Sequence, residues 1–139
     1  MPAKDIYHDT VIAALTADGW TITDDPLQLR YQKRDLYVDL AAERSPVAAE
    51  KEGRRIAVEI KSFLNKSQVE ALQEALGQFL MYREILAEIE AERILYLAVP
   101  KHIYEGILSE PLGRLMIDRS QLRLLVFSAK EERILKWIN

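Results

Sequence analysis

An acidic residue and a lysine stand two positions apart in the segment from Gly53 to Phe63, GRRIAVEIKSF. Apolar and other residues alternate through this segment, which predicts a β-strand. The core face of that strand carries Ile56, Val58 and Ile60. Glu59 and Lys61 share the opposite face, about 6.5–7 Å apart along the strand, so one bound metal ion or phosphate group can interact with both. The alternative interpretation is a surface ion pair, because Glu-x-Lys is common on solvated strands.

A second carboxylate comes from the segment Asp35–Ala41, DLYVDLA, which also alternates and predicts a strand. One face carries Leu36, Val38 and Leu40, and the other carries Asp35, Tyr37 and Asp39. We expect this strand to lie beside the strand of Glu59, with Asp39 and Glu59 on the same polar face. Neighbouring carboxylates repel one another, so a protein keeps such a pair where water, a cation or a lysine compensates the charge.

These three residues suit metal-assisted hydrolysis of a phosphodiester. Mg²⁺ takes oxygen ligands and typically binds one or two carboxylates together with water and phosphate. Asp39 and Glu59 are therefore candidate ligands of Mg²⁺ or Mn²⁺. Lys61 is a candidate catalytic residue that steadies the attacking water or the phosphate charge.

The longest predicted helix runs from Ser67 to about Glu90, and Ser67 with Glu70 forms a capping box at its start. Gln78 and Tyr82 lie four residues apart on this helix and so share one face. They are either boundary residues beside the apolar stripe or a polar face turned toward the strand carboxylates.

The remaining segments complete one α/β (or α+β) domain over residues 1–139, built around a mixed sheet. A strand, a long helix and another strand in that order indicate a parallel pair. Six residues on the two strands should be buried with the long helix packed over them, namely Ile56, Val58, Ile60, Leu95, Leu97 and Val99. The other expected elements are a helix at Lys4–Asp18 ended by Gly19, strands at Trp20–Thr23 and Leu27–Tyr31, a loop at Glu43–Pro46, a short extension at Val47–Glu50, a buried strand at Ile94–Val99, short helical pieces at Ile103–Leu108 and Leu112–Ile117, and a terminal strand pair at Leu122–Phe127 and Ile134–Ile138.

Composition restricts the classes of function. The net charge is −3, so the chain has no overall attraction to nucleic acid, and DNA contact requires a local basic patch, a metal or a basic partner. The absence of cysteine excludes disulfides and thiolate metal sites and fits a cytoplasmic protein. The N-terminus lacks the apolar run of a signal peptide, and no run approaches the roughly 20 residues of a membrane span.

The run from Asp35 through Glu59-Ile60-Lys61 to Gln78-x-x-x-Tyr82 resembles the PD-(D/E)XK nuclease superfamily. That resemblance implies a restriction-endonuclease-like αβββαβ core. Nearly the whole chain also resembles the XisH family, the fdxN-element excision controlling factors of cyanobacteria. The stretches that carry this second resemblance are MPAKDIYHD, DGWTITDDPL, KRDLYVDLAAE, IAVEIKSF, ALGQFLMYR, RILYLAVP and ILKWI.

The resemblance to nucleases assigns roles by position. Asp39 is the motif aspartate, and Glu59 and Lys61 are the E-x-K pair. Gln78 with Tyr82 matches a Gln-x-x-x-Tyr helix motif, which makes Gln78 a further candidate catalytic residue and Tyr82 a secondary candidate. No proline precedes the aspartate, and Asp35 has the same strand parity as Asp39, so Asp35 is an alternative motif acid. Glu50 is a third candidate if the segment Val47–Glu50 is the partner strand of Glu59. By the same resemblance His8 approaches the site from the first helix; the alternative for His8 is an isolated surface histidine.

The resemblance to XisH implies support of a site-specific recombinase during programmed DNA excision, in association with a second factor, XisI. The sequence is therefore compatible with two alternative functions. The first is a Mg²⁺-dependent endodeoxyribonuclease, and the second is a non-catalytic interaction protein that binds a partner or DNA. Self-association is also expected from apolar residues beyond the main stripe, unless they cover the end of the sheet: Ile103, Ile107, Leu108, Leu112, Leu115 and Met116.

Overall fold

The structure, a computed structural model, describes residues 4–45, 53–64 and 67–139. The elements in this part of the chain are α1 (His8–Ala17), β1 (Thr21–Asp24), β2 (Leu27–Tyr31), β3 (Arg34–Val38), β4 (Leu40–Arg44), β5 (Arg54–Ile60), α2 (Gln68–Ile89), β6 (Ile94–Pro100), α3 (Lys101–Glu105), the 3-10 helix η1 (Ile107–Ser109), α4 (Pro111–Ser120), β7 (Leu124–Ser128) and β8 (Arg133–Ile138).

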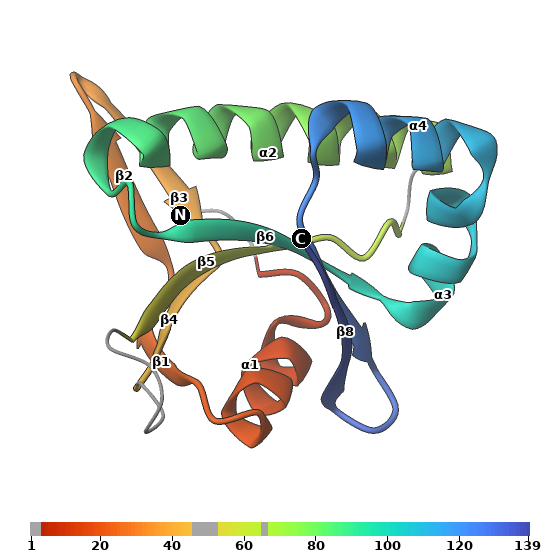
Figure 1. Cartoon of the computed structure of the whole chain (residues 1–139), viewed down its shortest axis with the longest axis horizontal. Coiled ribbons are helices and arrows are strands. Elements are labelled where there is room, and N and C mark those ends of the chain that lie inside the picture. Colours follow the sequence, from red (N-terminus) through yellow and green to blue (C-terminus); the bar gives the residue numbers. More distant parts are fainter. Residues whose placement is uncertain (1–3, 46–52, 65–66) are drawn as a thin grey trace.

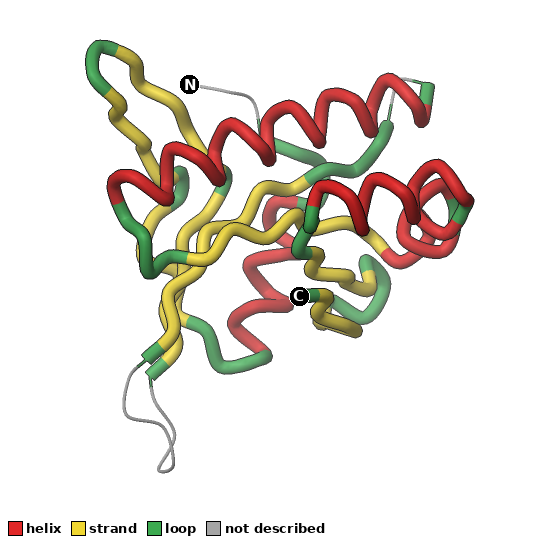
Figure 2. Tube along the Cα trace, turned by 45° about the horizontal axis from the view of Figure 1, so that its top comes forward, coloured by secondary structure: helices red, strands yellow, loops and turns green. Residues whose placement is uncertain are grey.

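A six-stranded mixed sheet forms the middle layer, with strand order β1-β4-β5-β6-β7-β8. The β5–β6 and β6–β7 pairs are parallel and the other pairs are antiparallel. Helices α2 and α4 lie over one face and α1 over the other (Figure 1). Strands β2 and β3 form a separate hairpin that projects from this sheet (Figure 2). The order α1, β1, β4, β5, α2, β6 confirms the expected αβββαβ core, with the hairpin inserted into it.

The core has two parts, one on each face of the sheet. All six residues expected to be buried on β5 and β6 are at most 3% exposed, so that prediction is confirmed. The α2 face carries Leu95, Leu97 and Val99, whereas Ile56, Val58 and Ile60 lie on the α1 face. The expectation that the long helix covers all six was therefore wrong. The in-register pairing of Val58 with Tyr96 and Glu59 with Leu97 explains this, because paired residues share a face.

Helix α2 thus packs on the face that carries Glu59. Ser67 accepts a hydrogen bond from the main-chain N–H of Glu70 at 3.1 Å, as the capping box predicts. The helix contacts β6 and β2, so it spans the width between the sheet and the hairpin. This placement brings polar residues of α2 to the end of β5 that carries the candidate site.

The predicted strand Asp35–Ala41 is interrupted at Asp39. β3 ends at Val38 within the hairpin, and β4 begins at Leu40 within the main sheet. Val38 accordingly packs in the α2-face core and Leu40 in the α1-face core, although simple alternation predicts one face for both. The chain changes partner strand at this point, which alternation alone does not reveal.

Several boundaries also differ from expectation. Helix α1 begins at His8, so the predicted start at Lys4 was too early. The end at Gly19 is confirmed, and its φ of +93° suits a residue without a side chain. Glu43 and Arg44 belong to β4 rather than to a loop, because they pair with β5. The predicted extension Val47–Glu50 lies outside the described residues.

The segment from α3 to α4 carries the apolar residues on which the expectation of self-association rests. Ile103–Leu108 is divided into α3 and η1, and Ile103, Ile107 and Leu108 are buried in the core. Leu112 and Leu115 on α4 remain 44% exposed. Met116 is partly buried against the same core, so four of these six apolar residues cover the end of the sheet. In the part of the chain described here, no helix has the length and hydropathy needed to cross a membrane.

Candidate functional site

Glu59 and Lys61 lie at the carboxyl end of β5, where the strand is covered by α2. β5 is an inner strand between β4 and β6, so its residues are shielded on both sides. The Glu59 side chain is only 7% exposed and that of Lys61 is 19% exposed. The Lys61 ammonium lies 3.7 Å from a Glu59 carboxylate oxygen. The structure thus rejects the interpretation of these residues as a solvated surface pair.

Asp39 meets Glu59 from the bend between β3 and β4. The main-chain N–H of Ile60 donates to the Asp39 carboxylate at 2.7 Å. In return, the main-chain N–H of Asp39 donates to the Glu59 carboxylate at 3.3 Å. The interruption of the strand at Asp39 therefore allows its side chain, rather than its main chain, to satisfy the backbone of β5. These two hydrogen bonds fix both carboxylates on the α2 face.

The electrostatic environment disfavours two negative charges here. Burial and the neighbouring Asp39 carboxylate raise the pKa of Glu59 to about 8, against the opposing charge of Lys61. Burial also raises the pKa of Asp39, although its hydrogen bond from Ile60 favours the ionised form. The pair consequently retains a proton near neutral pH in the absence of a bound cation.

Helix α2 adds Gln78 and Tyr82 to the same cavity, which has a volume of about 410 Å³. Burial and the nearby Glu59 and Asp39 raise the pKa of Tyr82 to about 12, so its hydroxyl stays protonated. The Gln78 Oε1 atom is buried, and no hydrogen-bond partner for it occurs among the described residues. Of the two interpretations of Gln78 and Tyr82, the structure matches the polar face turned toward the carboxylates.

Two further acidic residues line the cavity and were not predicted from the sequence. Glu74 lies 3.4 Å from the Lys61 ammonium. Its position four residues before Gln78 and eight before Tyr82 is a signal that helical spacing could have supplied. Asp5 accepts a hydrogen bond from the main-chain N–H of Ser62 at 3.2 Å. Nothing in the sequence around Asp5 indicates that this N-terminal segment returns to the end of β5.

The secondary candidates have different outcomes. Asp35 pairs with Arg30 at 3.2 Å within the exposed hairpin and does not line the cavity. Glu50 lies outside the described residues. His8 is not a surface residue: it is 4% exposed and its Nε2 atom lies 2.7 Å from Asp25. His8 does not line the cavity.

The donor set fits a hard divalent cation that keeps part of its water shell. Two carboxylates and a buried amide oxygen that lacks a partner are all oxygen donors, as Mg²⁺ and Mn²⁺ require. Within the described ranges, no group of three or more acidic or histidine side chains forms a complete cage. Two carboxylates would leave other coordination positions of such an ion to water.

Comparison with known proteins gives a consistent family assignment. A family model described as XisH protein matches residues 1–135. The crystal structure of an XisH family protein from Nostoc punctiforme is similar, with 40% identity, a TM-score of 0.88, and coverage of 97% of this chain and 100% of that chain. A crystal structure of an fdxN element excision controlling factor protein from Anabaena variabilis has 39% identity and a TM-score of 0.87, and the match covers 98% of this chain and 100% of that chain. A comparison with curated proteins gave no match.

Proposed function

This chain belongs to the XisH family, and we propose that it acts in programmed DNA excision as a metal-dependent phosphodiester hydrolase. The excision role follows from the similarity to the fdxN element excision controlling factor protein of Anabaena variabilis. The hydrolase proposal rests on the chain's own residues. We assign Asp39 and Glu59 as metal ligands, Lys61 as the catalytic cation, and Gln78 as a further polar contact.

The observation that carries the proposal is the buried carboxylate pair. Asp39 and Glu59 are held together by reciprocal hydrogen bonds with the main chain, and their pKa values are raised by burial and, for Glu59, by mutual repulsion. Pairing β4 with β5 does not require two buried carboxylic acids at one point, because burying a carboxylate costs free energy unless its charge is compensated. A bound divalent cation would offset the repulsion between the two carboxylates, and both would then serve as its ligands.

Each residue of the site would have a separate role in hydrolysis. A bound Mg²⁺ or Mn²⁺ supplies Lewis acidity and lowers the pKa of a coordinated water. Asp39 and Glu59 would hold that ion. Lys61, beside Glu59 and Glu74, would orient the attacking water or neutralise the charge that develops on the phosphate. Gln78 offers an amide that faces the same cavity.

A cleavage assay tests this proposal. We expect supercoiled and linear DNA to be cut in the presence of Mg²⁺ or Mn²⁺ and to remain intact with a chelator. Glu59→Gln and Lys61→Ala should each lower the rate by about 100-fold or more, since both remove groups that act in the transition state. Asp35→Asn is the matched control and should retain the rate, because Asp35 lies on the hairpin and not in the cavity.

A second candidate function is a non-catalytic interaction protein. The same hydrogen bonds that join Asp39 and Glu59 to the backbone also tie β4 to β5, which is a structural role. The net charge of −3 also lacks an overall attraction to DNA. If the protein binds a divalent ion at this pair but cuts no DNA, the non-catalytic interaction function is favoured over the hydrolase function.

We further propose that an XisI-like protein is a partner of this chain, on the basis of the family resemblance. Co-expression of the two proteins, with one tagged, tests this. We expect them to co-purify in a fixed ratio, and recovery of the tagged protein alone would contradict the proposal. Neither outcome depends on whether the carboxylate site is catalytic.

A further inference from the structure

A larger cavity, about 990 Å³ in volume, lies on the α1 face of the sheet. It is formed where β1, β4, β5, β6 and β8 present their side chains near the amino end of β5. No described residue lines both this cavity and the carboxylate site. The two regions are therefore separate, and the proposed hydrolase chemistry does not account for this one.

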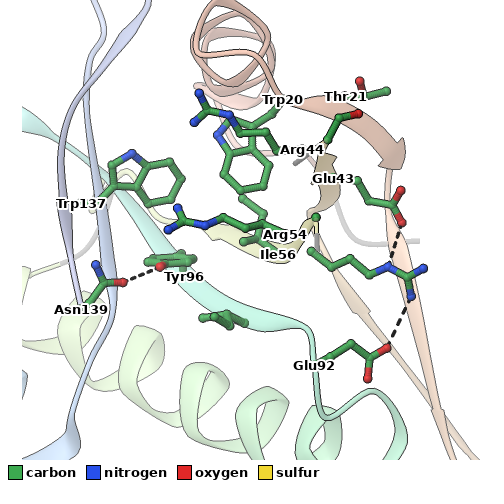
Figure 3. A pocket seen from close by; sticks show the side chains of 14 residues that line it. Trp20, Thr21, Glu43, Arg44, Arg54, Ile56, Glu92, Tyr96, Trp137 and Asn139 are labelled. Atoms are coloured by element: carbon green, nitrogen blue, oxygen red, sulfur yellow. Dashed lines mark hydrogen bonds and ion pairs between the residues drawn. The ribbon is translucent and has the colours of Figure 1, made fainter. Parts of the chain in front are cut away.

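Three aromatic rings form one wall of the larger cavity (Figure 3). The Trp137 ring centroid lies 5.8 Å from that of Trp20 and 4.8 Å from that of Tyr96. Trp20 and Tyr96 are 4% and 7% exposed, whereas Trp137 is only partly buried. The rings pack on one another and leave part of Trp137 available to a ligand.

The arginines of the cavity are not equivalent. Arg55 is compensated, because its guanidinium lies 3.2 Å from Glu43 and 3.4 Å from Glu92. Arg54 is exposed, and in Figure 3 its side chain points toward Trp137 and Tyr96. Among the described residues, no carboxylate forms an ion pair with Arg54.

The strand register places a second cation beside Arg54. Arg44 on β4 pairs directly with Arg54 on β5. Like charges directly opposite one another destabilise a sheet unless something compensates them. Arg44 forms an ion pair with Asp18 at 3.7 Å, and its guanidinium lies over the Trp20 ring at 5.9 Å, so among the described residues Arg54 is the member of this pair that lacks an acidic partner. The adjacent pair Glu43–Arg55 shows the complementary arrangement, so the Arg44–Arg54 pair indicates a place for an anion.

We propose that this cavity binds a nucleoside phosphate, with the phosphate on Arg44 and Arg54 and the base against Trp137. Guanidinium groups match the geometry of phosphate oxygens, and aromatic side chains stack on bases. Asn139 also lines the cavity; its amide oxygen accepts a hydrogen bond from the Tyr96 hydroxyl, and its amide N–H groups suit an acceptor on the edge of a base. Because Glu43 and Glu92 stand on one side, the cavity favours one phosphate group over a long polyanion.

The phosphate can belong to a free nucleotide or to the end of a nucleic-acid strand, and binding assays distinguish these sources. The only two tryptophans of the chain, Trp20 and Trp137, both line the cavity, so intrinsic fluorescence reports on it directly. The full chain is titrated with AMP, UMP, adenosine and inorganic phosphate. It is also titrated with a short single-stranded oligonucleotide that carries either a 5′-phosphate or a 5′-hydroxyl.

We expect a saturable fluorescence change with AMP and UMP, and an affinity about tenfold or more weaker for adenosine or phosphate alone. A preference for the 5′-phosphorylated oligonucleotide over both mononucleotides identifies the strand end as the source. Arg54→Gln should weaken binding by about tenfold or more, whereas the matched control Arg55→Gln should change it less than about threefold. Circular dichroism checks that both variants fold.

Three results would overturn the inference. The first is no saturable change with any nucleotide at millimolar concentration, and the second is an equal effect of Arg54→Gln and Arg55→Gln. The third is stronger binding of an acidic peptide than of any nucleotide, which would assign the cavity to a protein partner. Glu59→Gln should bind nucleotides normally, so failure of the hydrolase proposal leaves this test unaffected.

Discussion

Asp39 has two roles at the scale of single residues. Its carboxylate accepts the N–H of Ile60, and its own N–H donates to Glu59, so it joins two strands and also places two acids side by side. Alternation in the sequence was sufficient to select Glu59 and Lys61. It could not decide between Asp39 and Asp35, because both have the same parity and the strand break that separates their environments has no clear sequence signal.

The raised pKa of Glu59 predicts how stability depends on pH. A carboxyl group whose pKa rises from its ordinary value of 4.5 to about 8 on folding binds more protons in the folded state throughout that range. The contribution of Glu59 to the free energy of unfolding is therefore fully present below about pH 4.5 and is lost as the pH rises through 8. The raised pKa of Asp39 contributes in the same direction. Without divalent ions, we expect the midpoint of thermal unfolding, Tm, to fall between pH 5 and pH 8.

Two glutamine variants separate the contribution of Glu59 to this pH dependence from that of other carboxylates. Glu59→Gln should show a clearly smaller decline in Tm over the same pH range, because glutamine does not titrate. Glu92→Gln is the matched control, since the Glu92 side chain is 64% exposed and forms only a surface pair with Arg55. An identical decline in the wild type and in Glu59→Gln, measured by scanning calorimetry, would show that Glu59 is not perturbed.

The element that determines the site is β5, which is covered on both faces. The sequence predicts this strand, the long helix and the buried strand β6 because each has a strong periodic pattern. It did not predict which face α2 covers. Both faces of β6 are apolar, and the relation between the faces of β5 and β6 depends on their register, which is set only when the sheet assembles.

Val58 provides a test at this scale, because it is fully buried on the α1 face of β5. Val58→Asp places an unpaired charge in the core and should destabilise the protein by about 4 kcal/mol or more. Val69→Asp is the control: Val69 is 47% exposed on α2, and the change should stay within about 0.5 kcal/mol. Denaturant unfolding measures both, and a small effect of Val58→Asp would contradict the assigned orientation of β5.

The two faces of the whole molecule differ in chemistry. Acidic residues and Lys61 lie in the cavity on the α2 face, and arginines and aromatic rings line the cavity on the α1 face. Composition and net charge conceal this separation, because they average over both. The domain class and the αβββαβ order were accessible from the sequence, whereas the arginine-lined cavity was not, since its residues come from five strands and from the segments beside them.

Self-association is a prediction about the whole molecule that depends on α4. Leu112 and Leu115 lie three residues apart on this helix, and each is 44% exposed. We expect light scattering to show a dimer whose population rises with concentration, and the double variant Leu112→Glu/Leu115→Glu to be monomeric. Val69→Glu should leave the dimer unchanged. A wild-type chain that stays monomeric at high concentration would contradict the prediction.

The proposed metal site has a direct crystallographic test. Crystals grown at pH 8, where the carboxylates ionise more readily, are soaked in Mn²⁺ and measured at a wavelength at which manganese scatters anomalously. We expect an anomalous peak about 2.2 Å from carboxylate oxygens of both Asp39 and Glu59, and we expect it to be absent in Glu59→Gln. No peak between these two residues at saturating Mn²⁺, with both carboxylates well ordered, would contradict the assignment of this pair as a metal site.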